Sequence, residues 1–72
     1  MKNIKLLELG NKIRLERMKR GFSQEKLAEL ANVSIRTISD IERGLTDIRY
    51  TNLLQIASAF EITTSELLDF KL

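Results

Sequence analysis

The chain has 72 residues, with 12 Lys and Arg, 10 Asp and Glu, and neither cysteine nor histidine. Its length allows one domain at most, over residues 1–72, in which folding buries only about 60% of the unfolded surface. Because cysteine and histidine are absent, disulfides, thiolate metal sites and the usual general base are excluded, and we expect no enzyme, no metal and no cofactor.

The first predicted helix runs from about Ile4 to Lys19. Apolar residues recur at helical spacing along it, and Gly10 interrupts it at a point of close packing. Gly21 is the stop signal. The core candidates of this helix are Leu6, Leu9, Ile13 and Met18. The basic residues toward its end form either a solvated face or contacts with a phosphate backbone, and they are Lys12, Arg14, Arg17, Lys19 and Arg20.

The next two predicted helices are short and are joined by a tight turn. Ser23 can cap the first and Ser34 the second, because their hydroxyls can accept orphan backbone N–H groups. Asn32 fits the turn, since Asn tolerates left-handed backbone angles, and Gly44 is placed to end the second helix. The inward residues are Leu27, Ala28, Leu30 and Ala31 on the first helix and Ile38 and Ile41 on the second. This is the pattern of a DNA-binding helix-turn-helix.

The second of these helices, about Ile35–Arg43, has a mixed outer face. Helical pairs with polar outer faces are common in bundles, but the joint pattern of caps, turn and inward residues is more specific. A guanidinium, hydroxyls, a carboxylate and a branched apolar group together suit contacts with base edges. The exposed strip contains Ile35, Arg36, Thr37, Ser39, Asp40 and Arg43.

A fourth helix is predicted from about Arg49 or Thr51 to Phe60. Its start is open, because Thr51 is the better capping residue whereas Ile48 and Leu53 have hydrophobic-staple spacing around Arg49. The buried face consists of Leu53, Ile56, Ala57 and Phe60.

A fifth helix is predicted from about Thr64 to Phe70, after a capping box formed by Thr63 and Glu66. It carries more apolar surface than one short helix can bury. We expect Leu67 in the core and the remainder in an exposed patch. A symmetric dimer would cover that patch, and a monomer is the alternative. The predicted dimer interface is Leu68, Phe70 and Leu72.

Charge is distributed unevenly along the chain. Residues 1–50 carry eleven Lys and Arg against seven Asp and Glu, a net charge of +4, whereas residues 51–72 carry one against three, a net charge of −2. The basic part coincides with the helix-turn-helix, as a phosphate-facing surface requires. Apolar runs are short and the N-terminus lacks a cleavage site, so we expect a cytoplasmic protein without membrane contact.

The segments SQEKLAELANVSIRTISDIERG, LLQIASAF and ITTSELL resemble the lambda-repressor-like, Cro/C1-type helix-turn-helix family, from about Leu6 to Leu68. The resemblance implies an all-α fold of five helices, with helices 2 and 3 as the binding unit of a transcription regulator for double-stranded DNA. The run IERG…NLLQIA is similar to controller proteins of restriction–modification systems, with phage repressors and Cro-like proteins as rivals. No ligand or cleavage domain follows, so no small-molecule effector is expected; RNA polymerase is a further candidate partner.

The resemblance also implies roles at matching positions. Gln24 would contact a phosphate with help from the helix dipole, and Arg17 and Glu42 would form a partly buried ion pair. The base-reading stretch would be Ser34, Ile35, Arg36, Thr37 and Ser39. Further candidates for backbone contact are Lys12, Arg14, Arg43, Thr46, Arg49 and Tyr50.

The sequence departs from the family pattern at two positions. Asn32 stands where Gly is commoner in the turn, and Ile35 stands where many relatives have a polar or basic side chain. Ile35 either contacts a thymine methyl or covers the neighbouring core. Arg43, in turn, either contacts DNA or pairs with Asp40 or Asp47.

The resulting hypothesis is a homodimeric regulator that places one recognition helix in each half of a palindromic operator, with Arg36 contacting guanine O6 and N7. The alternative is a protein-interaction module, antitoxin-like or partner-bound, that keeps this fold and uses the apolar C-terminal surface. Salt dependence separates the two, because DNA binding weakens steeply as salt rises.

Overall fold

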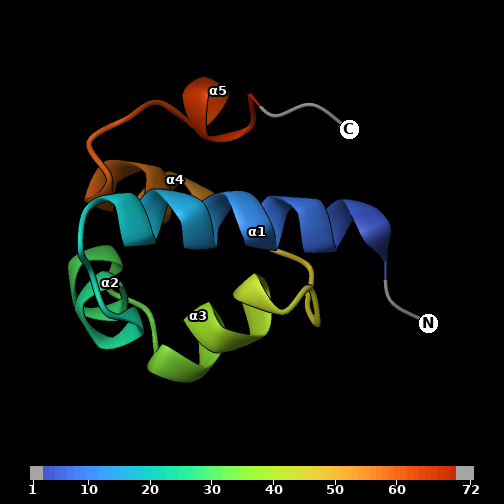
Figure 1. Cartoon of the computed structure of the whole chain (residues 1–72), viewed down its shortest axis with the longest axis horizontal. Helices are drawn as coiled ribbons and strands as arrows, with labels where there is room; N and C mark the ends of the chain where they lie inside the picture. Colours follow the sequence, from blue (N-terminus) through green and yellow to red (C-terminus); the bar gives the residue numbers. More distant parts are fainter. Residues whose placement is uncertain (1–2, 70–72) are drawn as a thin grey trace.

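The computed structural model describes residues 3–69, and within that range it contains five helices and no strand. Figure 1 shows α1 crossing the molecule, with α2 and α3 below it in this view and α4 and α5 behind and above it. This arrangement confirms the predicted all-α class with five helices. The helices are α1 (Ile4–Lys19), α2 (Gln24–Ala31), α3 (Ile35–Glu42), α4 (Tyr50–Ala59) and α5 (Thr64–Leu67).

Side-chain caps fix the starts of four helices. The hydroxyl oxygen of Ser23 accepts from the Lys26 N–H at 2.9 Å, and that of Ser34 accepts from the Thr37 N–H at 3.0 Å. At α5 the predicted capping box is complete, with Thr63 and Glu66 each accepting the other's backbone N–H at 3.0 Å. Asn3 caps α1 in the same way, a cap that the sequence analysis did not identify.

Left-handed backbone at the ends of α2 and α3 produces the two sharp turns around the central helix pair. Asn32 has a φ of 58° and a ψ of 46°, as its place in the turn predicts. Gly44 has a φ of +69°, and a Cβ atom there would lie 2.9 Å from the Cα of Leu7. Glycine is therefore needed at position 44 for its conformation and for its lack of a side chain.

α1 and α3 touch at backbone distance. A Cβ atom on Gly10 would overlap the carbonyl oxygen of Ile41 and would lie 2.9 Å from that of Glu42. The predicted close packing at Gly10 is confirmed, and it fixes α3 against α1 without an intervening side chain.

The core lies where α1 to α5 meet. The predicted burial of two residues is wrong: Met18 is 57% exposed and Leu30 is 45% exposed. At about 100° per residue, Met18 lies roughly 140° around α1 from the buried Ile13. Leu30 likewise lies beyond Leu27, on the side away from Ala28 and Ala31. The buried apolar residues are Ile13, Leu27, Ala28, Ala31, Ile38, Ile41, Leu53, Ile56, Ala57, Phe60 and Leu67.

The structure decides the ambiguous start of α4 and corrects the predicted end of α5. α4 begins at Tyr50 after Arg49, so the staple spacing of Ile48 and Leu53 marked its start, and Thr51 is not the cap. α5 ends at Leu67 rather than near residue 70. A short helix depends on packing of its apolar face, and Leu67 alone is buried in this segment as far as residue 69. Among residues 3–69, every helix is too short or too polar to cross a membrane.

Candidate nucleic-acid interface

α3 separates a buried face from an exposed face. Ile38 and Ile41 are at most 1% exposed and anchor the helix in the core. On the opposite side, the side chain of Arg36 is 90% exposed and that of Arg43 is 62% exposed. The helix therefore offers to solvent the face that the sequence predicted. Of the base-reading candidates, Ser34, Ile35 and Arg36 are exposed, whereas Thr37 and Ser39 are partly buried.

The hydroxyls at the start of α3 are held by the cap itself. Ser34 Oγ lies 2.8 Å from Thr37 Oγ1 and also accepts the Thr37 N–H. This pairing fixes both side chains while leaving unused lone pairs for an incoming donor. Ile35 beside them keeps 46% of its surface exposed, so an apolar surface remains available for a thymine methyl.

An ion pair joins α3 to α1 behind the exposed face. Arg17 Nε lies 2.7 Å from Glu42 Oε2, and Arg17 Nη2 lies 3.1 Å from Glu42 Oε1, which gives the bidentate geometry typical of strong pairs. Arg17 Nη1 also donates to the carbonyl of Phe22 at 2.8 Å. The Glu42 side chain is only 3% exposed. The pair therefore orients α3 relative to α1 from within the structure.

Gln24 belongs to the same network. It is the first residue of α2, and its Nε2 donates to Glu42 Oε1 at 3.1 Å. Its amide therefore has a fixed position at the end of α2, and the second N–H on Nε2 remains available. The predicted contact between Gln24 and a phosphate stays a prediction, but the side chain is oriented before any ligand arrives.

The basic residues of α1 lie on different sides of the helix. Lys12 lies 3.0 Å from Glu16, and Arg20 lies 2.7 Å from the same carboxylate. Arg20 also donates to the Phe60 carbonyl at 3.0 Å, so this cluster ties α1 to the end of α4. Lys12 is about 200° around α1 from Gly10, and the structure therefore does not bring it to the α3 side. Arg14 is exposed and lies within about 40° of Gly10.

The Glu16 carboxylate has an unusual acidity. The hydrogen bond from Arg20 is the largest cause that lowers the pKa of Glu16, from 4.5 to about 2. Burial opposes the shift, and Lys12 and Lys19 add to it. The carboxylate is therefore ionised at neutral pH and compensates part of the positive charge of α1.

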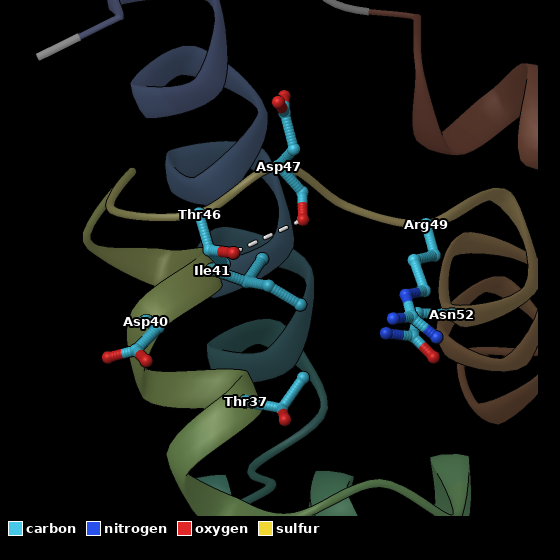
Figure 2. A pocket seen from close by; sticks show the side chains of 7 residues that line it. All are labelled: Thr37, Asp40, Ile41, Thr46, Asp47, Arg49 and Asn52. Carbon is cyan, nitrogen blue, oxygen red and sulfur yellow. Dashed lines mark hydrogen bonds between the residues drawn. The ribbon is translucent and has the colours of Figure 1, made fainter.

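A hollow of about 360 Å³ lies beside α3, between its C-terminal half, the following loop and the start of α4 (Figure 2). Figure 2 shows Arg49 and Asn52 on the α4 side, facing Thr37 on α3. Its lining consists of Thr37, Asp40, Ile41, Thr46, Asp47, Arg49 and Asn52. The hollow thus brings predicted backbone-contact residues of the loop next to a predicted base-reading residue.

α4 differs from the other helices at its N-terminus. Its N-cap residue, Arg49, makes no side-chain capping hydrogen bond, whereas the other four helices within residues 3–69 are capped by side chains. The first N–H groups of α4 are therefore not used by a cap, and such groups attract anions. Tyr50 follows and is 66% exposed. Sequence reasoning missed Asn52 and this open helix start, although an arginine in a capping position is a detectable signal.

Arg43 and Arg36 both approach Asp40. Arg43 Nη2 donates to Asp40 Oδ1 at 3.4 Å, and Arg36 Nε lies 3.8 Å from Asp40 Oδ2. The pairing of Arg43 with Asp40, considered above as an alternative to DNA contact, is thus present. The distance is long and Arg43 is exposed, so the contact between Arg43 and DNA stays a prediction.

The predicted dimer patch is described only in part. Leu68 is 45% exposed. Phe70 and Leu72 lie outside the described residues.

Within residues 3–69, no group of acidic side chains comes together in a way that could hold a metal ion.

Comparisons with known proteins agree with this geometry. Residues 13–67 match the helix-turn-helix family HTH_3. The chain is 42% identical over 69 residues to the control protein C.BamHI from Bacillus amyloliquefaciens, covering 94% of this chain and 84% of that protein. The restriction-modification controller protein C.AhdI from Aeromonas hydrophila has a similar structure, with a TM-score of 0.88 and 32% identity over 90% of this chain and 98% of that chain.

A third similarity concerns a protein solved with its ligand. The biofilm master regulator SinR, whose crystal structure is in complex with DNA, superposes with a TM-score of 0.79 and 32% identity. The match covers 85% of this chain and 98% of that chain.

Proposed function

Because the chain belongs to the helix-turn-helix family HTH_3, we propose that it is a homodimeric transcription regulator that binds a palindromic site in double-stranded DNA. The observation that carries this proposal is the exposed face of α3, which is held against α1 by the Gly10 contact and by the Arg17–Glu42 pair. A helix fixed in this way can enter a major groove without losing further conformational freedom.

The residues on this face divide into two roles. Arg36 is our candidate for a bidentate contact with guanine O6 and N7, because it is the most exposed cation on α3 and lies in its first turn. Ser34, Ile35, Thr37 and Ser39 would contact neighbouring base edges. The backbone would be held by Gln24, Arg14, Arg43, Thr46, Arg49 and Tyr50, with Lys12 the least favourably placed of the original candidates.

Size supports the dimer. The described part of the chain extends 29 by 24 by 22 Å, whereas successive major grooves on one side of DNA are about 34 Å apart. One copy therefore spans a single half-site, and two copies side by side match the spacing. The exposed Leu68, with its neighbours along the chain, is the proposed contact between copies.

The similarity to C.BamHI and C.AhdI supports a narrower proposal, that this regulator is the controller of a restriction–modification system. Contact with RNA polymerase is a further proposal of the same kind, tested by transcription from a target promoter with purified polymerase. Neither proposal changes the DNA contacts expected of α3.

The test is selection of bound duplexes from a random DNA library, followed by sequencing. We expect a two-fold-symmetric site, binding that weakens steeply as salt rises, and a band of two protein copies per duplex. Arg36→Ala should weaken the selected site by about 1–3 kcal/mol and relax preference at one base pair in each half. Lys26→Ala, which removes an exposed cation on α2, is the matched control.

Either of two results would refute the proposal. A folded protein that enriches no sequence at low salt is not a sequence-specific regulator, and salt-insensitive capture of another protein would favour the interaction-module alternative. An Arg36→Ala variant that keeps the wild-type base preference would remove Arg36 from the base-reading role.

A further inference from the structure

Asp40 is a carboxylate in the middle of the face that we propose enters the groove. One of its oxygens faces Arg36 and the other faces Arg43, at 3.8 and 3.4 Å. Its side chain is 29% exposed, compared with 90% and 62% for the two arginines. Asp40 therefore lies between the two cations of the exposed face and behind their outer ends.

We propose that Asp40 is a specificity-determining residue, which holds Arg36 in place and disfavours complexes in which Arg36 turns to a phosphate instead of a base edge. This inference rests on the proposed function. It assigns to Asp40 a role in discrimination rather than in affinity.

The stability of the free protein does not explain this arrangement. Exposed ion pairs one helical turn apart contribute little to folding, because water screens them and long side chains must be ordered. Within residues 3–69, the recorded hydrogen bonds of the Asp40 side chain are limited to the one from Arg43. Removal of the carboxylate should therefore leave the fold intact.

The geometry of Arg36 is compatible with base contact while the pair persists. The atom nearest to Asp40 is Nε, on the inner side of the guanidinium. The outer edge, formed by Nη1 and Nη2, remains available for the two acceptors of a guanine. The same carboxylate can thus support the guanidinium from behind while it contacts a base in front.

A complex with the wrong DNA sequence has a different balance of charge contacts. Arg36 would gain most by turning to a phosphate oxygen, which would separate it from Asp40. The carboxylate would then lie beside a polyanion without the Arg36 cation, and like charges at such distances repel. Asp40 therefore adds an unfavourable term to non-specific complexes, which is one of the ways in which a protein discriminates between partners.

The experiment compares Asp40→Asn with Glu29→Gln. Both changes remove one negative charge, and Glu29 also pairs with a cation one turn away, Lys26 at 3.1 Å, but on α2. Equilibrium binding of each variant to the selected duplex and to a scrambled duplex, by fluorescence anisotropy at matched salt, gives a specificity ratio. We expect Asp40→Asn to tighten binding to the scrambled duplex several-fold more than Glu29→Gln does, and to lower the ratio about ten-fold.

Two further measurements separate this role from a structural one. Both variants should unfold at the same urea concentration as the wild type. In an Arg36→Ala background, Asp40→Asn should change the ratio much less. A ratio that Asp40→Asn leaves unchanged, or changes no more than Glu29→Gln does, would overturn the inference, as would a full effect in the Arg36→Ala background. A wild-type protein with no preference between the duplexes would instead refute the proposed function, and this inference with it.

Discussion

The ion pair between Arg17 and Glu42 gives the sharpest test of how α3 is held. Replacing Arg17 by Met removes both hydrogen bonds to a carboxylate that is 3% exposed, and also the one to the Phe22 carbonyl. Because Glu42 then stays buried without its cation, with only Gln24 as a donor, the change should cost about 3–5 kcal/mol. A domain of this size has a total stability of about 4–11 kcal/mol at 0.05–0.15 kcal/mol per residue, so roughly a quarter of that stability or more should be lost.

The double variant Arg17→Met/Glu42→Leu should be more stable than Arg17→Met alone. It removes the buried charge together with its partner, and apolar replacements of such pairs are often neutral. The Gln24 amide and the Phe22 carbonyl lose a partner, but both residues are only partly buried and can turn to water, so we expect a remaining cost of about 1–3 kcal/mol.

Urea unfolding followed by far-ultraviolet circular dichroism measures these differences, with the slope of the transition as a check that the same surface is exposed. The control is Lys26→Ala/Glu29→Ala, which removes an exposed pair and should cost less than about 1 kcal/mol. The reasoning is refuted if Arg17→Met costs less than about 1 kcal/mol, or if the double variant is no more stable than Arg17→Met.

Three other predictions concern the scaffold around α3. Gly10→Ala should destabilise the protein by about 1–3 kcal/mol, measured by urea unfolding, and should weaken DNA binding, because the new methyl group would meet the Ile41 and Glu42 carbonyls and displace α3. Helix propensity alone would give a gain of stability, and such a gain would contradict the close contact. The lowered pKa of Glu16 should stabilise the folded state fully above pH 4.5, and this contribution, at most about 3 kcal/mol, should be lost as pH falls toward 2. Glu16→Gln should flatten this part of the curve of unfolding free energy against pH, and an unchanged curve would exclude Glu16 as the cause of the acid sensitivity. Ser34→Ala should cost about 1 kcal/mol in stability by removing the α3 cap, whereas Ser34→Asn should keep most of the capping stabilisation. Thermal unfolding of both variants measures the difference, and equal losses of stability would argue against capping.

Local interactions explain why so much of the fold could be predicted. A cap involves residues two or three apart, and a left-handed turn involves one residue. The caps at Ser23, Ser34 and Thr63 and the turn at Asn32 can therefore be recognised from neighbouring residues in the sequence. The inward positions of α3 follow from helical spacing in the same way. The outward face of α3 was therefore predictable as well, since it is what remains.

The tertiary structure decided what depends on residues distant in the chain. Met18 was predicted to be a core residue although helical spacing places it about 140° from Ile13, and the packing of the other helices around α1 leaves that side exposed. Lys12, by contrast, pairs with Glu16 one turn along α1, which is a local contact. The link from Gln24 through Glu42 to Arg17 spans three helices, and no local pattern indicates that Gln24 shares its acceptor with Arg17.

The sequence by itself thus determined the order of the five helices, the caps of α2, α3 and α5, and the face that α3 presents, because each depends on side chains within one or two turns. The tertiary structure decided how that face is supported. Asp40 was one of six residues of the exposed strip in the sequence, and its pairing with Arg43 was one of two alternatives there. The structure shows that pairing and a second approach, of Arg36 to the same carboxylate. Local chemistry sets the elements of this protein and the ion pairs one turn apart, and contacts between helices set the buried Arg17–Glu42 pair that supports α3.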